Sequence, residues 1–363
     1  MSDRLRLEWR FTALIALIVG SYVAAVALYA NAHNDLQALA ISGLNPLVVL
    51  VFGSTLGLLL GCYVLRSAWR ARKQNTVALV WADVRQGALR RDQLIARLTI
   101  FAGWFCMMLA FSPFKYLIGR VRGFPFDPML LRIGHVLFFG HDGWQITHAM
   151  FGSPVATAIL QMVYSAWFFM VWLSIIYCIV RSDDARFRMQ FLLAFLLCWI
   201  LVGSVAAYWL ASAGPCFYQH IFGDAHFAPL MNRLHMLDQK IAAVAPGWRL
   251  LSIDEQNWLW NSYADSANAF GAGISAMPSM HVAFAALMAR GGFAIDRRTG
   301  WILSISAVLI WIASIHLGWH YTIDGIVGAP MGVATWYLAG WMLRALVFGA
   351  SARPSMIAEG PAA

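Results

Sequence analysis

Long apolar segments separated by short polar ones dominate the chain. Eight segments approach the about 20 apolar residues that a helix needs to cross a bilayer: 11–30, 44–65, 98–114, 154–180, 189–213, 279–296, 300–318 and 325–348. Composition agrees, since 61% of the 363 residues are hydrophobic and 12% are charged, against roughly 25% charged in soluble domains. The sequence therefore predicts an all-α integral membrane protein with about eight transmembrane helices.

The polar segments divide this chain into regions. Residues 1–97 hold two N-terminal spans and a basic loop, which suits either an amphipathic helix on the inner leaflet or a simple topology signal. Residues 98–348 hold a predicted six-helix core, and within it residues 214–277 are polar enough to form an outer cap. Residues 349–363 are predicted to be a disordered tail.

The distribution of positive charge predicts the orientation. Most of the 26 Lys and Arg residues fall on the side that holds the N-terminus, and positively charged loops stay in the cytoplasm. Both termini are therefore predicted to be cytoplasmic, with the cap on the outer face. The net charge of +9 is then explained by insertion and anionic lipids, not by nucleic acid. An Ala-rich composition with more Arg than Lys is compatible with a bacterial inner membrane.

The N-terminal segment and the cysteines do not change this predicted topology. The first segment also reads as a signal peptide, with "ANA" after it, but its apolar run exceeds the usual core of about 7 to 15 residues, so we interpret it as a span. Among the five cysteines, Cys216 lies at an outer boundary and the others lie within predicted spans. They offer no disulfide framework or CxxC metal site.

Polar residues collect at the outer ends of the later spans. The stretch "SIHLGWHYTIDG" places His316, His320 and Asp324 four residues apart, and "GISAMPSMHVAF" places Ser279 and His281 where an apolar segment begins. If helical, the first three would share one face. Ionisable groups at membrane depth are costly and indicate function; a polar cluster that only ties helices together is the alternative.

These residue types suit phosphoryl transfer. Asp324 would fix the tautomer of His320 and stabilise its imidazolium, as a nucleophilic nitrogen requires. His281 could protonate a leaving group, while Ser279 and the backbone N–H groups at the helix start receive an anion. We interpret the other histidines as ordinary loop or interface residues: His33, His135, His141, His148, His220, His226 and His235.

"PSMH" and "HYTID" resemble the second and third signature motifs of the type 2 phosphatidic acid phosphatase superfamily, in the branch similar to inositol phosphorylceramide and sphingomyelin synthases. The resemblance covers roughly residues 98–348 and implies a six-span core that acts on a membrane lipid, with a lipid or water acceptor. It also implies that His320 is the nucleophile, Asp324 its orienting carboxylate and His281 the general acid.

The chain departs from the family pattern at several positions. Met280 replaces a Gly of the second motif, and Ser314 replaces an Arg six residues before the nucleophile. Lys115 and Arg122 keep the spacing of the first signature, but Gly123 replaces its Pro. Because the family places that signature on the span just before the second one, we interpret Lys115 and Arg122 as interfacial anchors.

At the span just before the second motif, where the family has its first signature, the chain has "AGPCFYQ". We interpret this stretch as the substrate-facing turn. The candidate substrate-binding residues are Ser279, Met280, His316, Gly214, Tyr218, Lys115 and Arg122. Loss of the family arginine favours a singly charged phosphodiester, and so the transfer of a phospho-headgroup between lipids. A phosphatase acting on a phosphomonoester or pyrophosphate lipid is the alternative, with a cap cation (Arg233, Arg249 or Lys240) replacing the arginine.

Two other hypotheses use the same residues. His316, His320, Asp324 and His281 could form a zinc or iron site, although we expect neither a metal nor a cofactor. Alternatively, the cluster could be the proton relay or binding site of a lipid transporter or flippase. Against a transporter, no pair of Gly/Pro-broken segments recurs in two halves of the chain.

Overall fold

The computed structural model describes residues 3–40, 43–44, 91–180, 184–266 and 269–348, with single positions between 53 and 61. The predicted span at 44–65 and the basic loop lie largely outside the described residues, and the tail at 349–363 lies wholly outside them. The regular secondary structure of the described chain is helical apart from two short parallel strands, in which Gly43 pairs with Ala269 and Leu44 with Phe270.

Six stretches of helix are long and apolar enough to cross a membrane, which supports an integral membrane protein. They are Leu5–Ala32, Ile95–Arg122, Pro154–Cys178, Ala185–Trp209, Arg297–His316 and Thr322–Phe348. The elements that form them are α1 (Asp3–Ala32), α4 (Arg91–Arg122), α7 (Pro154–Val180), α8 (Ala185–Ile200) with η2 (Leu201–Ala206) and α9 (Ala207–Trp209), α14 (Arg297–His316), and α15 (Thr322–Met342) with η5 (Leu343–Phe348). The predicted count of eight spans is not confirmed.

The predicted span at 279–296 forms the shorter helix α13 (Met280–Phe293), which has 14 residues. At 1.5 Å per residue it is about 21 Å long, less than the about 30 Å of a hydrocarbon core. Most of its side chains are buried and it packs against α14 and α15. A helix that is apolar on all sides is expected inside a protein, so its hydropathy reflects the protein interior.

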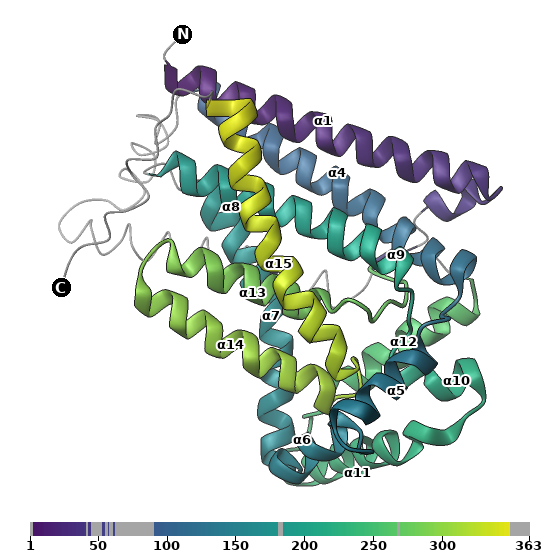
Figure 1. Ribbon diagram of the computed structural model, residues 1–363. Helices are drawn as coiled ribbons and strands as arrows, with labels where there is room; N and C mark the ends of the chain where they lie inside the picture. Colours follow the sequence, from purple (N-terminus) through teal and green to yellow (C-terminus); the bar gives the residue numbers. More distant parts are fainter. Residues whose placement is uncertain are drawn as a thin grey trace.

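Short helices gather at one end of the molecule, opposite the N-terminal end of α1 (Figure 1). They include α5 (Asp127–Leu137) and α6 (Gly143–Phe151), between α4 and α7. The cap contributes the others: η3 (Pro215–Phe217), α10 (Tyr218–Phe222), η4 (Ala225–Phe227), α11 (Ala228–Val244) and α12 (Leu251–Ala264). The remaining elements are η1 (Leu36–Leu39), β1 (Gly43–Leu44) and β2 (Ala269–Phe270).

Close backbone packing holds α13 against α15. A Cβ added to Gly332 would lie 2.0 Å from the carbonyl oxygen of Ala283, and one added to Gly328 would lie 2.7 Å from that of Ser279. Larger residues would separate the two helices. These glycines therefore fix the distance between the segments that carry His281 and His320.

Candidate active site

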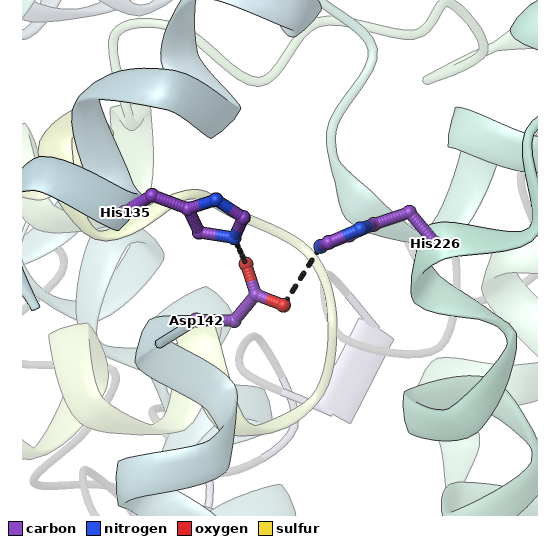
Figure 2. A group of neighbouring side chains, drawn as sticks. All are labelled: His135, Asp142 and His226. Atoms are coloured by element: carbon purple, nitrogen blue, oxygen red, sulfur yellow. Dashed lines mark hydrogen bonds and ion pairs between the residues drawn. The ribbon is translucent and has the colours of Figure 1, made fainter. Parts of the chain in front are cut away.

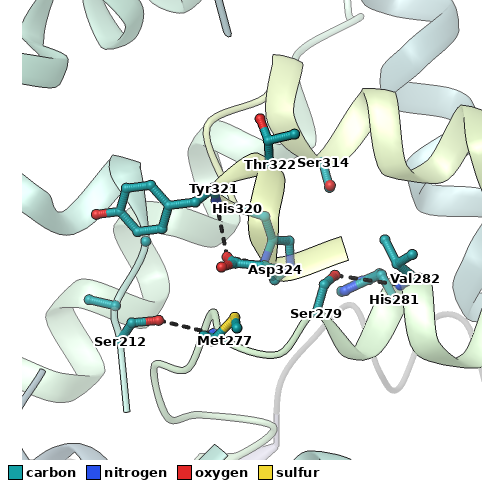
Figure 3. Close-up of polar contacts among 12 residues, drawn as sticks. Ser212, Met277, Ser279, His281, Val282, Ser314, His320, Tyr321, Thr322 and Asp324 are labelled. Atoms are coloured by element: carbon teal, nitrogen blue, oxygen red, sulfur yellow. Dashed lines mark hydrogen bonds and ion pairs between the residues drawn. The ribbon is translucent and has the colours of Figure 1, made fainter. Parts of the chain in front are cut away.

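His320 lies in the turn between α14 and α15 and not on a continuous helix. Helix α14 ends at His316, Gly318 has a φ of +77°, and α15 begins at Thr322. His320 Nδ1 lies 3.2 Å from Asp324 Oδ2. The same carboxylate oxygen accepts the Tyr321 N–H at 3.0 Å, at the start of α15 (Figure 3). Asp324 thus orients His320 while it completes the helix terminus.

His281 lies in the first turn of α13. Its ring stacks on Tyr164, with centroids 4.4 Å apart, and Nδ1 lies 3.2 Å from the Tyr164 hydroxyl oxygen. The indole of Trp167 lies 4.1 Å away. These aromatic contacts fix the imidazole, and Nε2 is buried without a hydrogen-bond partner among the described residues. The centroids of His281 and His320 are 6.1 Å apart, which leaves room for a reacting group between them.

Ser279 is fully buried and connects the two histidine segments. Its hydroxyl oxygen accepts the Val282 N–H at 3.5 Å as the N-cap of α13, and its own N–H donates to the carbonyl oxygen of Asp324 at 3.1 Å. The Ser212 hydroxyl oxygen accepts the Met277 N–H at 3.0 Å, just before this cap (Figure 3). These contacts give Ser279 a positioning role and place its side chain outside the cavity lining.

His281 and His320 both line a cavity of about 240 Å³. Its walls are mainly apolar, and Met280 is part of them. Helix α12 of the cap adds two polar residues, Ser252 and Glu255. The aromatic lining residues include Trp104, Phe111, Trp167, Phe168, Trp172 and Trp199. A small number of polar groups in an apolar cavity is typical of a ligand site.

The structure separates Lys115 from Arg122. Helix α4 does not end near residue 114 but continues through Pro113 to Arg122, so that Lys115 points into the protein and lines the cavity. The guanidinium carbon of Arg122 lies over the rings of Tyr208 and Trp209, 5.0 and 5.8 Å from their centroids. The anchor interpretation therefore suits Arg122, whereas Lys115 is part of the cavity lining.

The cap cations do not reach this site. Arg249 pairs with Asp238 at 2.8 Å, and Arg233 lies beside Gly152. Neither they nor Lys240 line the cavity. Among the described residues that do, Lys115 is the only Lys or Arg.

The turn that holds Gly214 is joined to the His320 turn through Asp127. Gly214 N–H and the Tyr321 hydroxyl donate to Asp127 Oδ1, both at 2.9 Å, and Ala213 N–H donates to Oδ2 at 2.8 Å. Gly214 has a φ of +99°, and an added Cβ would lie 2.5 Å from the carbonyl oxygen of Trp319. Neither Gly214 nor Tyr218 lines the cavity, although their neighbours Ala213 and Phe217 do.

Asp127 was not among the residues that sequence reasoning selected. Burial raises the pKa of its carboxyl to about 6, while its hydrogen bonds to Ala213, Gly214 and Tyr321 act in the opposite direction. The signal was one acidic residue in the aromatic stretch "GFPFDPM". An isolated carboxylate in such a stretch must find donors inside the protein.

His316, which the sequence analysis selected as a candidate substrate-binding residue, lies outside the cavity lining. Its ring stacks on His148 at 3.8 Å, and its Nε2 lies 3.0 Å from the Thr157 hydroxyl oxygen. His148 Nε2 donates to the His316 carbonyl oxygen at 2.9 Å. Burial lowers the pKa of His148 to about 4, so this ring is neutral near pH 7. The pair joins α6 to α14.

The metal alternative for the active site is not supported by geometry. In the part of the chain that the structure describes, His316, His320, Asp324 and His281 do not form a group whose ligand atoms all lie within 4.8 Å.

The structure thus has six helices long enough to cross a membrane and a mainly apolar cavity lined by two histidines. A model of the PAP2 superfamily matches residues 128–338, and the chain belongs to that superfamily. Its members are phosphatases and phosphotransferases, which supports an enzyme that acts on lipid phosphoesters. The matched range includes His281, His320 and Asp324. No curated protein and no solved structure matches the chain, and the synthase branch is not confirmed.

Proposed function

We propose that the protein moves a phospho-headgroup from one membrane lipid to another through a phosphohistidine at His320, as an inositol phosphorylceramide synthase does. The observation that carries the proposal is the placement of His281 and His320 in one cavity wall, with ring centroids 6.1 Å apart and Asp324 on Nδ1 of His320. This leaves Nε2 of His320 for the substrate.

Each half-reaction follows from this geometry. In the first, the lone pair of His320 Nε2 attacks phosphorus, and the bond from phosphorus to the leaving lipid oxygen breaks. Protonated His281 gives that oxygen its Nε2 proton. In the second, an acceptor hydroxyl returns a proton to His281 and attacks the phosphohistidine, whose P–N bond breaks. Asp324 compensates the positive charge that His320 carries in between.

The cavity favours transfer over hydrolysis. A phosphomonoester brings two negative charges, which require several cationic donors, and Lys115 is the only Lys or Arg among the described lining residues. A phosphodiester brings one charge. Mainly apolar walls also favour a lipid hydroxyl over water as the acceptor. We therefore place the lipid chains of substrate and acceptor along the aromatic wall.

The test is product analysis with purified protein in detergent. Wild type is incubated with headgroup-labelled phospholipids, with and without alcohol-bearing lipid acceptors, beside His320→Ala and, as a matched histidine control, the exposed His33→Ala. We expect label in a new lipid only with an acceptor, and only with wild type and His33→Ala. Label released to water regardless of acceptor would identify a phosphatase. Equal turnover by His320→Ala would exclude the phosphohistidine.

The same assay addresses the transporter alternative. Detergent solution contains no membrane and no gradient, so an obligate transporter cannot show net function there. Turnover that depends on His320 excludes that alternative. Failure of every substrate, with His320→Ala and wild type alike, would favour it.

We also propose that both termini are cytoplasmic and that the cap faces the outside. Val244, 86% exposed in α11, is a suitable reporter. In a background whose five native cysteines are replaced by serine, Val244→Cys should react with an impermeant thiol reagent added to intact cells. Protection until the membrane is opened would reverse the orientation.

A further inference from the structure

A second histidine–aspartate group lies outside the cavity, among the short helices. His135 is in the last turn of α5, Asp142 is the N-cap of α6, and His226 is in η4 of the cap. In the described chain, these three form the one group of at least three His, Cys, Asp or Glu residues whose ligand atoms all lie within 4.8 Å of one another. Three separate segments thus direct their side chains to one point (Figure 2).

The two imidazoles approach the carboxylate from different sides. His135 Nε2 lies 3.0 Å from Asp142 Oδ1, and His226 Nε2 lies 2.9 Å from Oδ2 (Figure 2). The ring centroids of the two histidines are 5.3 Å apart. Zinc bonds of about 2.0 to 2.2 Å with tetrahedral angles separate ligand atoms by about 3.4 Å. The two distances from nitrogen to oxygen are a few tenths of an ångström shorter than this separation, and all three ligand atoms lie within 4.8 Å of one another.

Neighbouring groups hold these three residues in place. Trp144 Nε1–H donates to Asp142 Oδ2 at 3.2 Å, and the Asp142 N–H donates to Gln145 Oε1 at 3.1 Å. The N–H of His226 donates to the side chain of Asp224 at 3.0 Å. Contacts of this kind orient the ligands of metal sites. The Asp142 side chain is 10% exposed, while those of His135 and His226 are 35% and 29% exposed, so an ion and a water ligand can enter.

We propose that His135, Asp142 and His226 bind a divalent transition-metal ion of the zinc type, with water as the fourth ligand. Two imidazoles and one carboxylate are a donor set of Zn²⁺, whereas Ca²⁺ and Mg²⁺ prefer oxygen ligands. No sequence motif predicts this site, because its ligands are separated by 7 and 84 residues and match no known ligand spacing.

The ion would fasten the cap to the turn that carries His320. Asp142 directly precedes Gly143, and a Cβ added to Gly143 would lie 2.1 Å from the Thr322 hydroxyl oxygen. His226 directly precedes Phe227, whose ring lies 5.9 Å from that of Tyr321. Two contacts of the His320 turn are therefore next to metal ligands. The ion has a structural role here and takes no part in the bond changes at phosphorus.

The test is metal binding by the purified full-length chain in detergent. Protein stripped with a chelator, and then freed of it, is titrated with Zn²⁺ and with Co²⁺. We expect one equivalent to bind, the visible absorption of tetrahedral Co²⁺, and a Zn²⁺-dependent rise in the unfolding temperature. Asp142→Asn and His135→Ala should weaken binding at least tenfold, since each removes a ligand. His141→Ala, an exposed neighbour outside the group, should bind as wild type.

A second variant separates metal binding from hydrogen bonding. The amide of His226→Gln can still hydrogen-bond to Asp142 but is a poor zinc ligand, so we expect a normally folded protein whose unfolding temperature no longer responds to Zn²⁺. No stoichiometric binding by wild type, or wild-type binding by all three ligand variants, would overturn the proposal and leave a hydrogen-bonded His–Asp–His group.

Discussion

Two of the neighbouring histidine pairs near the cap differ in what surrounds them. His281 and His320 line the cavity, and His320 has a carboxylate partner in Asp324. The rings of His148 and His316 stack with centroids 3.8 Å apart and planes 8° from parallel, and both residues lie outside the lining. The residue type is the same in both pairs. Access to a cavity and a carboxylate distinguish a pair suited to chemistry from one that joins helices.

The turn between α14 and α15 creates this difference. On an uninterrupted helix, residues four apart would share a face, and His316 and His320 would serve one site. Because the helix ends at His316 and Gly318 adopts a positive φ, the chain reverses before His320. His316 then faces α6 while His320 faces α13.

The largest expected effect separates His320 from His316. His320→Ala should abolish both turnover and the acid-labile phosphoenzyme, because no other group replaces the nucleophile. His316→Ala should keep turnover within a few-fold and lower the free energy of unfolding by about 1 to 3 kcal/mol, since it removes the bond to Thr157 and the stack on His148. Rapid-quench labelling and thermal unfolding measure the two effects. Loss of turnover in a well-folded His316→Ala variant would contradict the assignment of this pair to a purely structural role.

His281→Ala should have the next largest effect, slowing turnover about 10²- to 10⁴-fold, the usual contribution of general acid catalysis. The phosphoenzyme should still form from a substrate whose leaving group needs no proton. A nitrophenyl phosphodiester offers such a leaving group, so its first step should be nearly as fast as in wild type. Equal losses with both substrates would assign His281 to binding instead of proton transfer.

The features of this site that depend on residues close together in the sequence could be predicted, whereas those that depend on distant residues could not. The helical class, the positions of six of the eight predicted spans and the contact between His320 and Asp324 follow from local patterns in hydropathy and spacing. The separation of Lys115 from Arg122 does not, because it depends on how α4 packs after Pro113. Asp127 accepts hydrogen bonds from residues that lie 86, 87 and 194 positions away in the sequence. No local sequence pattern predicts these contacts. The length of α13 also depends on its neighbours.

A smaller effect is expected when the two matched cations of α4 are compared. Lys115→Met should lower kcat/KM about 10- to 100-fold, the loss of one hydrogen bond to a charged group, mainly through a higher KM. Arg122→Met should change it little, because Arg122 lies over Tyr208 and outside the lining. Steady-state kinetics with a phosphodiester lipid measures both. Equal losses in the two variants would return Lys115 to the role of an anchor.

The last expected effect is on stability and not on turnover, and it concerns Asp127, which connects the His320 turn to the start of the cap. Burial raises the pKa of its carboxyl from 3.8 to about 6, so between these pH values the folded chain holds a proton that the unfolded chain lacks. Stability must then fall as pH rises through this window, by up to about 3 kcal/mol for a shift of this size. Asp127→Asn cannot titrate, so wild type should gain stability relative to this variant as pH falls from 7 to 4.

The measurement is the unfolding temperature of wild type, Asp127→Asn and Asp254→Asn across that pH range. Asp254 is an exposed residue of the cap and serves as the control. Acid affects all other groups equally in wild type and Asp127→Asn, and the difference between the two proteins therefore reports one carboxyl. A difference that stays constant with pH would mean that the donors Ala213, Gly214 and Tyr321 outweigh burial. Asp127 would then stay ionised across this pH range and join the Gly214 turn to the His320 turn through its hydrogen bonds. Its removal should disturb the His320 turn at every pH.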